Sequence, residues 1–141
     1  MAKGKVLVAG TFDFLHPGHV DFFLQARKHG DFLVVVVARD DNARRFKKRK
    51  PYFNQKERLA LVAALKEVGR AVLGGKKDFF AVVRKEKPDA IVLGYDQWPD
   101  EKAVRRALDN AGLMKTKIYR AKPFCEERYK SSNIREYFEN I

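Results

Sequence analysis

The chain has 141 residues, 45% of them hydrophobic and 12% aromatic, which fits a single folded domain over residues 1–141 and excludes an intrinsically disordered chain. Its 30 Lys and Arg residues outnumber the 18 Asp and Glu residues to give a net charge of +12, which favours anionic partners such as phosphorylated small molecules, nucleic acid or acidic lipid. The single cysteine, Cys125, cannot form an internal disulfide. The chain has no apolar stretch of about 20 residues, and its start resembles a strand rather than a signal peptide. We therefore expect a cytoplasmic protein with no membrane partner.

The first forty residues predict a βαβ unit. Continuous apolar runs at 6–9 and 32–38 are typical of strands that are buried on both faces, as in a parallel sheet. A helix is expected over 17–29 between them, since Pro17 suits a first helical turn. Gly30 is expected to end that helix in the left-handed conformation.

The remaining sequence continues the alternation of strands and helices. Asn54 and Glu57 have the spacing of a capping box, which predicts a helix start. The apolar face of this helix is expected to comprise Leu59, Leu61, Val62 and Leu65. Further strands are expected at 71–73, 90–93 and 117–119, with helices near 78–86, 99–111 and from Ser131 or Ser132 to Asn140. The pattern predicts an α/β fold with a single doubly wound, Rossmann-like, five-stranded parallel sheet flanked by helices.

Ligands of such a sheet bind outside the carboxyl ends of the strands, where the strand order reverses. The loops at this edge are expected to be residues 10–19, 39–53, 94–98 and 120–132. These segments hold nearly all the residue types suited to phosphate chemistry.

The first of these loops ends in the first turn of a helix, where unpaired backbone donors and the helix dipole favour a phosphate. Gly10 and Gly18 are expected to let the backbone come close to a ligand. His16 and His19 are three residues apart, so they project from one side of the helix and can donate hydrogen bonds to the same phosphate. The alternative is a pair of polar loop histidines without a ligand. A zinc site lacks further residues at ligand spacing, so no metal-binding residue is assigned.

Two other phosphate-binding loops are excluded by sequence. A Walker A loop needs Gly-Lys-Ser/Thr at the start of its helix, and the dinucleotide fingerprint needs three glycines at fixed spacing. Neither pattern follows the first predicted strand. A P-loop kinase and a hydride-transferring Rossmann enzyme are therefore not indicated.

Three sequence motifs resemble those of the HxGH nucleotidylyltransferase (cytidylyltransferase-like) superfamily, and the match extends over the whole chain. They are Gly10-Thr11-Phe12-Asp13 with His16-Pro17-Gly18-His19, then Gly94-Tyr95-Asp96-Gln97, then Ser131-Ser132-Asn133-Ile134-Arg135. The resemblance implies transfer of a nucleoside monophosphate from ATP or CTP to a phosphorylated acceptor, with release of pyrophosphate. It also implies a divalent cation such as Mg²⁺ that bridges the triphosphate oxygens rather than occupying a protein cage.

The resemblance assigns His16 and His19 as the catalytic residues, which hold the α- and β-phosphate oxygens as charge develops. It assigns nucleotide binding to these two histidines together with Gly10, Thr11, Phe12, Pro17, Gly18, Gly94, Asp96, Ser131, Ser132 and Arg135. Ordinary helix capping is the alternative for Ser131 and Ser132, and a plain turn residue is the alternative for Asp96.

The second loop carries six positive residues among the seven from Arg44 to Lys50. A solvated charge run and a nucleic-acid patch are alternatives to phosphate capture. Similarity to cytidylyltransferases implies that Lys50 reaches the acceptor phosphate and that Arg58 supports it. Asp13 and Asp40 resemble acceptor-side polar residues, with local turn structure as the alternative.

Within the superfamily the chain is most similar to archaeal FAD synthetases, which implies that FMN and ATP give FAD and pyrophosphate. Glycerol-phosphate cytidylyltransferases using CTP are the near alternative, but their corresponding turn usually has Trp directly after Asp, where this chain has Gln97. A basic nucleic-acid-binding module is a distant alternative, because the basic run has few aromatic residues within it. Similar proteins imply a homodimer, with Phe22 as a candidate contact, and no nucleic-acid partner.

Overall fold

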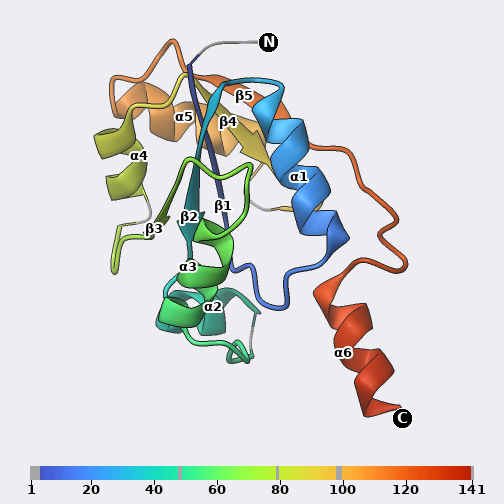
Figure 1. Cartoon of the computed structure of the whole chain (residues 1–141). Coiled ribbons are helices and arrows are strands. Elements are labelled where there is room, and N and C mark those ends of the chain that lie inside the picture. Colours follow the sequence, from blue (N-terminus) through green and yellow to red (C-terminus); the bar gives the residue numbers. More distant parts are fainter. Residues whose placement is uncertain (1–3, 48, 79, 98–99, 141) are drawn as a thin grey trace.

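Strands and helices alternate along the chain in the computed structural model, which describes residues 4–47, 49–78, 80–97 and 100–140 (Figure 1). The side chains of 46, 47 and 131 are also outside this description. The strands are β1 (Lys5–Gly10), β2 (Phe32–Val37), β3 (Arg70–Leu73), β4 (Ala90–Leu93) and β5 (Lys117–Arg120). The helices are α1 (Pro17–Arg27), α2 (Asp40–Lys47), α3 (Gln55–Ala63), α4 (Phe80–Glu86), α5 (Glu101–Asn110) and α6 (Ser131–Glu139).

The five strands form one parallel sheet in the order β3-β2-β1-β4-β5, which confirms the predicted fold class. The chain moves outward from β1 through β2 to β3, then crosses back to β4 on the other side of β1. The strand order therefore reverses between β1 and β4. Pairing of β1 with β2 continues to Gly10 and Val37, whereas β1 and β4 pair at Leu7 and Ile91 and then separate toward their carboxyl ends.

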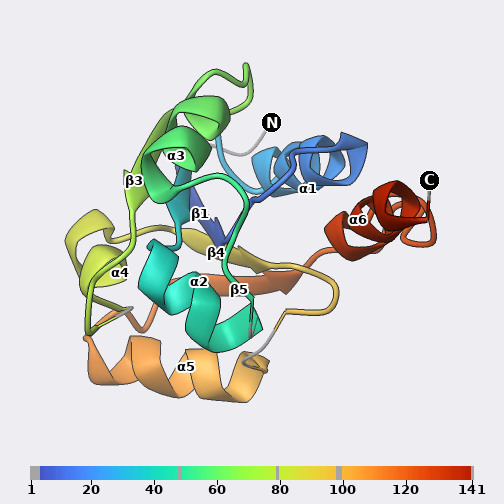
Figure 2. The same cartoon turned by 90° about the horizontal axis from the view of Figure 1, so that it is seen from below.

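Helices cover both faces of the sheet (Figures 1 and 2). On one face Val6 and Val8 of β1 pack with Phe23 of α1 and Val62 of α3. On the other face Leu7 packs with residues of α4 and α5, namely Val83, Val104 and Leu108. Burial of alternate side chains on opposite faces explains why the strands are continuous apolar runs.

Two local predictions were wrong. Gly30 does not have a positive φ, and a Cβ at this position would lie 2.8 Å from the carbonyl oxygen of Gly4, so close backbone packing explains this glycine. Leu61 was expected on the apolar face of α3 but is 44% exposed. Helix α3 ends at Ala63, so Leu65 lies in the following turn and packs against the core from there. Leu61 and Leu65 therefore do not share a face of one helix.

The second loop contains a helix that the sequence did not predict, α2. Asp40 and Asp41 lie in its first turn, where negative charge complements the helix dipole. Ala43 is buried, but the helix has too few apolar residues to show a helical period. The basic residues of this loop therefore begin on a helix rather than on an irregular segment.

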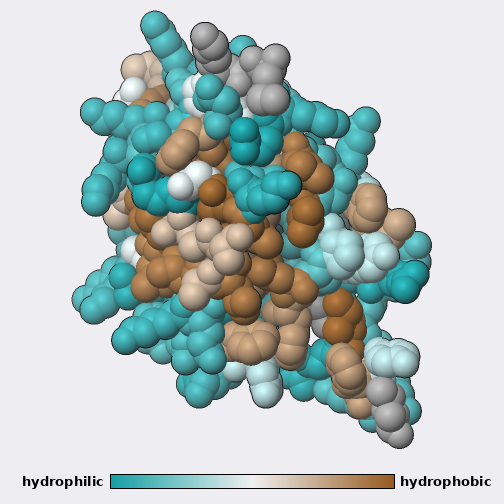
Figure 3. Space-filling view, viewed as in Figure 1, coloured by the Kyte–Doolittle hydropathy of each residue, from teal (hydrophilic) through white to brown (hydrophobic). Residues whose placement is uncertain are grey.

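Helix α6 lies beside the sheet rather than on it, and residues 121–130 connect it to β5 (Figures 1 and 2). Arg135 and Glu139 attach it to the body through ion pairs with Asp13 at 3.1 Å and Arg49 at 3.4 Å. Apolar side chains show on the face of α6 in Figure 3, and Tyr137 and Phe138 are each 68% exposed.

Within the described residues, no helix has the length and apolar character needed to cross a membrane. Phe22, the candidate dimer contact, is half-buried and packs against the core from α1. The homodimer stays a prediction.

Candidate active site

The start of α1 is capped by two histidines instead of the usual Ser and Glu. Nδ1 of His16 accepts from the amide of Gly18 at 3.1 Å, and Nδ1 of His19 accepts from the amide of His16 at 3.2 Å. This is a capping box, which satisfies backbone donors of the first turn reciprocally. The ring centroids are 3.8 Å apart, so the two imidazoles lie together, as their spacing predicts.

The cap fixes where each imidazole carries its proton. A ring nitrogen that accepts an N–H has no proton of its own, so the neutral rings carry theirs on Nε2. Burial lowers the pKa of His16, which favours this neutral form near pH 7. The arrangement therefore places two imidazoles beside a helix N-terminus, a combination suited to binding an anion.

The glycines of the first loop have explanations within the protein. A Cβ at Gly18 would lie 2.8 Å from Cε1 of His16 and 2.9 Å from the carbonyl oxygen of Tyr129. A Cβ at Gly10 would lie 2.8 Å from the ring of Phe12. Gly94 differs, because its Cβ would meet Gln97 at 3.5 Å, an ordinary contact. The protein itself therefore has room for a side chain at Gly94.

The loop between β1 and α1 has an unusual backbone. Phe12 and Phe14 have φ angles of 57° and 53°, in a region that residues other than glycine rarely adopt. The Phe12 ring is 6% exposed and packs against Phe23 and His19, with centroids 5.3 and 5.6 Å away. Its side chain belongs to the core, so contact with a phosphate is left to its backbone amide.

Arg58 lies underneath this loop. Its guanidinium is fully buried and donates to the carbonyl oxygens of Thr11 at 2.7 Å and Phe53 at 2.9 Å, and to the carboxylate of Asp40 at 2.8 Å. Arg58 therefore acts here as a positioning residue that fixes Thr11, and Asp40 is its partner. The expected direct support of Lys50 by Arg58 is not seen among the described contacts.

Asp13 joins three segments of the site. Its carboxylate is 7% exposed and accepts from the amides of Tyr52 at 2.7 Å and Phe53 at 3.1 Å. It also accepts from Arg135 of α6 at 3.1 Å. Asp13 and Arg135, which the sequence assigned to opposite substrates, are thus partners of each other.

Gln97 bridges the gap where β1 and β4 separate. Its Nε2 donates to the carbonyl oxygen of Ala9 at 2.9 Å, and its Oε1 accepts from the amide of Gly94 at 2.9 Å. The side chain thus replaces ladder hydrogen bonds and sets the spacing between the two loops at the switch point. Gln97 departs from a family motif, but no local sequence pattern indicates this contact, which joins segments far apart in the chain.

The turn after β4 contacts the segment that leads to α6. Asp96 pairs with Lys130 at 3.6 Å, both side chains being about half exposed. Burial raises the pKa of Tyr95, and the nearby negative charges of Asp96 and Glu126 add to the effect. Trp98, which follows this turn in the sequence, lies outside the described residues.

Residues 121–130 bring Tyr129 beside the histidines. Its ring lies 6.5 Å from that of His16 with an 18° angle between planes. The N-cap of α6 is Lys130, so Ser131 and Ser132 occupy the first turn and neither is the N-cap. Ser132 is exposed at this helix start.

Lys50 is exposed at the other rim of the site, next to the buried Pro51. A hollow follows where α2 and α3 begin, lined by Asp40, Asp41, Asn54, Gln55 and Lys56. Of the sequence-predicted acceptor residues, Asp40, Lys50 and Arg58 thus lie in the connection from β2 to β3, and Asp13 follows β1. The Gly94 turn follows β4, which pairs with the opposite edge of β1 from β2.

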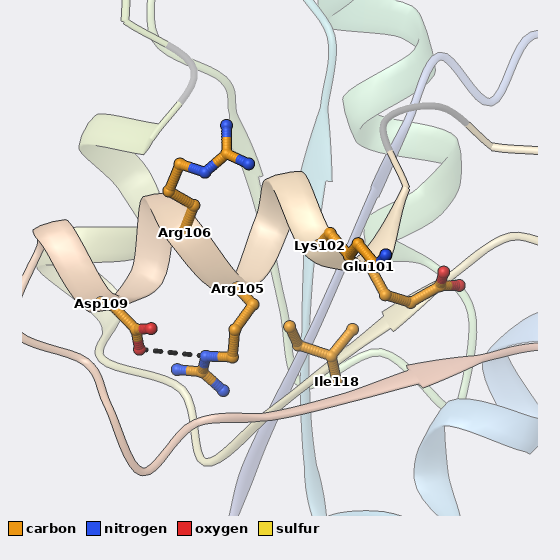
Figure 4. A pocket seen from close by; sticks show the side chains of 6 residues that line it. All are labelled: Glu101, Lys102, Arg105, Arg106, Asp109 and Ile118. Carbon is orange, nitrogen blue, oxygen red and sulfur yellow. Dashed lines mark hydrogen bonds and ion pairs between the residues drawn. The ribbon is translucent and has the colours of Figure 1, made fainter.

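A second hollow lies away from the histidines, between α5 and β5 (Figure 4). It is lined by Glu101, Lys102, Arg105, Arg106, Asp109 and Ile118. Arg105 is already bonded to Asp109 at 3.0 Å and to two backbone carbonyls. No residue assigned from sequence to catalysis or binding lines this hollow.

Within the described part of the chain, no three His, Cys, Asp or Glu side chains gather into a metal site. The acidic groups nearest the histidine loop in sequence are already engaged, as Asp13 is by two amides and Arg135. This donor set fits a cation held by phosphate oxygens better than one held by the protein.

Comparison with known proteins points to one family. The cytidylyltransferase-like family model matches residues 7–137. The chain is 46% identical over 123 residues to an FAD synthase of Ferroglobus placidus, covering 86% of this chain and 80% of the relative. It is 49% identical over 120 residues to an FAD synthase of Aciduliprofundum boonei, covering 85% and 79%. A solved lipopolysaccharide core biosynthesis protein from Thermoplasma volcanium superposes with a TM-score of 0.81 at 42% identity, covering 85% of this chain and 97% of that one.

Proposed function

The chain belongs to the cytidylyltransferase-like family and is a nucleotidyltransferase, and we propose that it transfers AMP from ATP to FMN, giving FAD and pyrophosphate. The observation that carries this proposal is the pair of imidazoles at the start of α1, whose Nδ1 atoms both accept from backbone amides of the first turn. The similarity to FAD synthases supports FMN and ATP as the substrates.

The reaction needs positioning and charge stabilisation rather than a covalent enzyme intermediate. A phosphate oxygen of FMN attacks the α-phosphorus of ATP in line. The bond from that phosphorus to the oxygen that bridges the α- and β-phosphates breaks, which releases pyrophosphate. His16 and His19 donate from Nε2 to the α- and β-phosphate oxygens as negative charge develops. The amides of Thr11 and Phe12 and the N-terminus of α1 add fixed donors.

The nucleotide lies between α1 and the turn after β4 in this proposal. Pro17 and Gly18 contact the nucleotide at the helix start, and Gly94 leaves space for the nucleoside. Asp96 gives up its exposed ion pair with Lys130 and accepts a hydrogen bond from a ribose hydroxyl. Ser131, Ser132 and Arg135 at the start of α6 bind the leaving phosphates. Mg²⁺ or another divalent cation accompanies the triphosphate and neutralises part of its charge.

Gly94→Ala is expected to weaken ATP binding without destabilising the fold. Because a Cβ fits at 3.5 Å from Gln97, the free energy of unfolding should change by less than about 1 kcal/mol, whereas the KM for ATP should rise roughly tenfold as the methyl group meets the nucleoside. Gly74→Ala is the matched control, because its Cβ also makes an ordinary contact, 3.5 Å from Val36, at the end of β3. An unchanged KM for ATP in the Gly94 variant would remove this glycine from the nucleotide site.

Lys50→Ala is expected to raise the KM for FMN and leave that for ATP unchanged, since the exposed ammonium faces the acceptor phosphate in this proposal. A rise of roughly tenfold corresponds to one charge-assisted hydrogen bond. Lys66→Ala removes an exposed lysine beyond the end of α3 and serves as the control. Equal KM values for FMN in wild type and the Lys50 variant would show that Lys50 is a solvated surface residue without a role in acceptor binding.

The proposed function is tested by pyrophosphate release with ATP or CTP crossed against FMN, glycerol 3-phosphate, phosphoethanolamine and a sugar phosphate. We expect the ATP and FMN pair to give the highest kcat/KM, with FAD as the product. Preference for CTP with an alcohol phosphate or a sugar phosphate would instead support the cytidylyltransferase alternative. Binding of oligonucleotides that falls steeply with salt, without turnover of any pair, would support a nucleic-acid module.

A further inference from the structure

An exposed aromatic ring stands beside the phosphate loop. Tyr52 is 73% exposed, although its amide is bonded to the buried carboxylate of Asp13 at 2.7 Å. Its ring stacks on Phe14, with centroids 5.4 Å apart and planes 22° from parallel, and meets Phe53 at 5.0 Å with perpendicular planes. The ring is thus fixed by neighbours while most of its surface faces solvent. Burial does not explain a ring held in this way.

Cationic residues contact the ring that supports Tyr52 or come just before Tyr52 in the chain. Arg135 lies over the ring of Phe14, with its guanidinium carbon 5.3 Å from the centroid. Lys50 and Arg49 are exposed and come just before Tyr52 in the chain. Phe14 is two residues from His16, so the phosphate-binding end of α1 is close in sequence to the ring that supports Tyr52. A planar ring joined to a phosphate matches this aromatic surface next to Lys50, the residue proposed to reach the acceptor phosphate.

The position of Tyr52 decides which substrate ring it meets. Tyr52 lies in the segment between α2 and α3 that follows β2, whereas the Gly94 turn follows β4, and β2 and β4 pair with opposite edges of β1. The nucleoside of ATP occupies the β4 side in the proposed function. The ring beside Tyr52 is therefore that of the acceptor.

We propose that the exposed face of Tyr52, supported by Phe14, stacks on the isoalloxazine ring of FMN and selects a flavin phosphate over alcohol phosphates without a ring. This inference rests on the proposed function. A ring already held in place loses little conformational freedom on binding, which favours stacking. Glycerol 3-phosphate and phosphoethanolamine would gain nothing from this surface.

The test measures KM for FMN and for ATP in FAD synthesis by the full chain and its variants. Tyr52→Ala should raise the KM for FMN about tenfold and leave that for ATP unchanged, and Tyr52→Phe should stay within about twofold of wild type because it keeps the stacking face. Tyr137→Ala removes a similarly exposed tyrosine from α6 and should change neither value. Thermal unfolding of each variant shows that the chain remains folded.

The two proposals fail in different ways. If wild type makes FAD but Tyr52→Ala leaves the KM for FMN unchanged, or raises the KM for ATP equally, the stacking role is overturned and the proposed function stands. If wild type makes no FAD from FMN and ATP, the proposed function and the stacking role are both overturned. If Tyr52→Phe loses as much as Tyr52→Ala, the hydroxyl rather than the ring face is responsible, which also overturns stacking.

Discussion

Replacing Arg58 by Ala is expected to lower the free energy of unfolding by about 3 to 5 kcal/mol. The side chain is fully buried, and its loss would leave the carbonyl oxygens of Thr11 and Phe53 without their donor and Asp40 without its cation. It would also leave a cavity of arginine size under the phosphate loop. Equilibrium denaturation in urea measures the change.

Two control variants separate the contribution of hydrogen-bond geometry to this free energy from the contribution of charge. Arg58→Lys keeps the charge but cannot donate along three directions from one planar group, so it should recover less than half of the loss. Arg106→Ala removes an exposed arginine from α5 and should cost less than about 0.5 kcal/mol. A loss below about 1 kcal/mol for Arg58→Ala would contradict the role of Arg58 as the support of Thr11.

His16→Asn and His19→Gln are each expected to lower kcat by roughly 30- to 1000-fold, or about 2 to 4 kcal/mol, with a much smaller effect on nucleotide affinity. Asn is a favoured N-cap residue, and Gln is favoured three residues later, so each variant keeps the capping box. The free energy of unfolding should therefore change by less than about 1 kcal/mol. Single-turnover kinetics with ATP and FMN separate the chemical step from binding.

His29→Ala is the matched control for the histidine variants. His29 lies beyond the other end of α1, where its ring stacks on Tyr119 with centroids 3.7 Å apart. Its removal should leave kcat unchanged. A loss of nucleotide affinity with kcat unchanged in His16→Asn or His19→Gln would mean that the imidazoles bind the ground state and the transition state equally and do not speed the chemical step.

The sequence predicted the features of the fold that depend on local pattern. The apolar runs at 6–9 and 32–38 indicated strands buried on both faces, and Asn54 with Glu57 indicated the start of α3. Helix α2 was missed because its residues are almost all polar, so burial of Ala43 gives no period to detect. Gly30 was misinterpreted because close packing against Gly4 leaves no local signal.

In the candidate site too, features set by local spacing were predicted and features set by distant contacts were not. The spacing of His16 and His19 was sufficient to place their rings on one side of α1, because a helix fixes neighbours three residues apart. The roles of Arg58 and Gln97 depend on contacts with Thr11 and Ala9, which are 47 and 88 residues away in the chain. Such contacts are set by the topology of the sheet and leave no periodic pattern in the sequence.

The central claim is that the two imidazoles converge on the phosphates of one nucleotide at the start of α1. A crystal structure of the chain with a non-hydrolysable ATP analogue and Mg²⁺ tests it most directly. We expect Nε2 of both His16 and His19 within hydrogen-bond distance of phosphate oxygens, with Gly94 against the nucleoside. Phosphates bound elsewhere, such as along the hollow between α5 and β5, with the histidine pair contacting no part of the nucleotide, would contradict this role of the histidines.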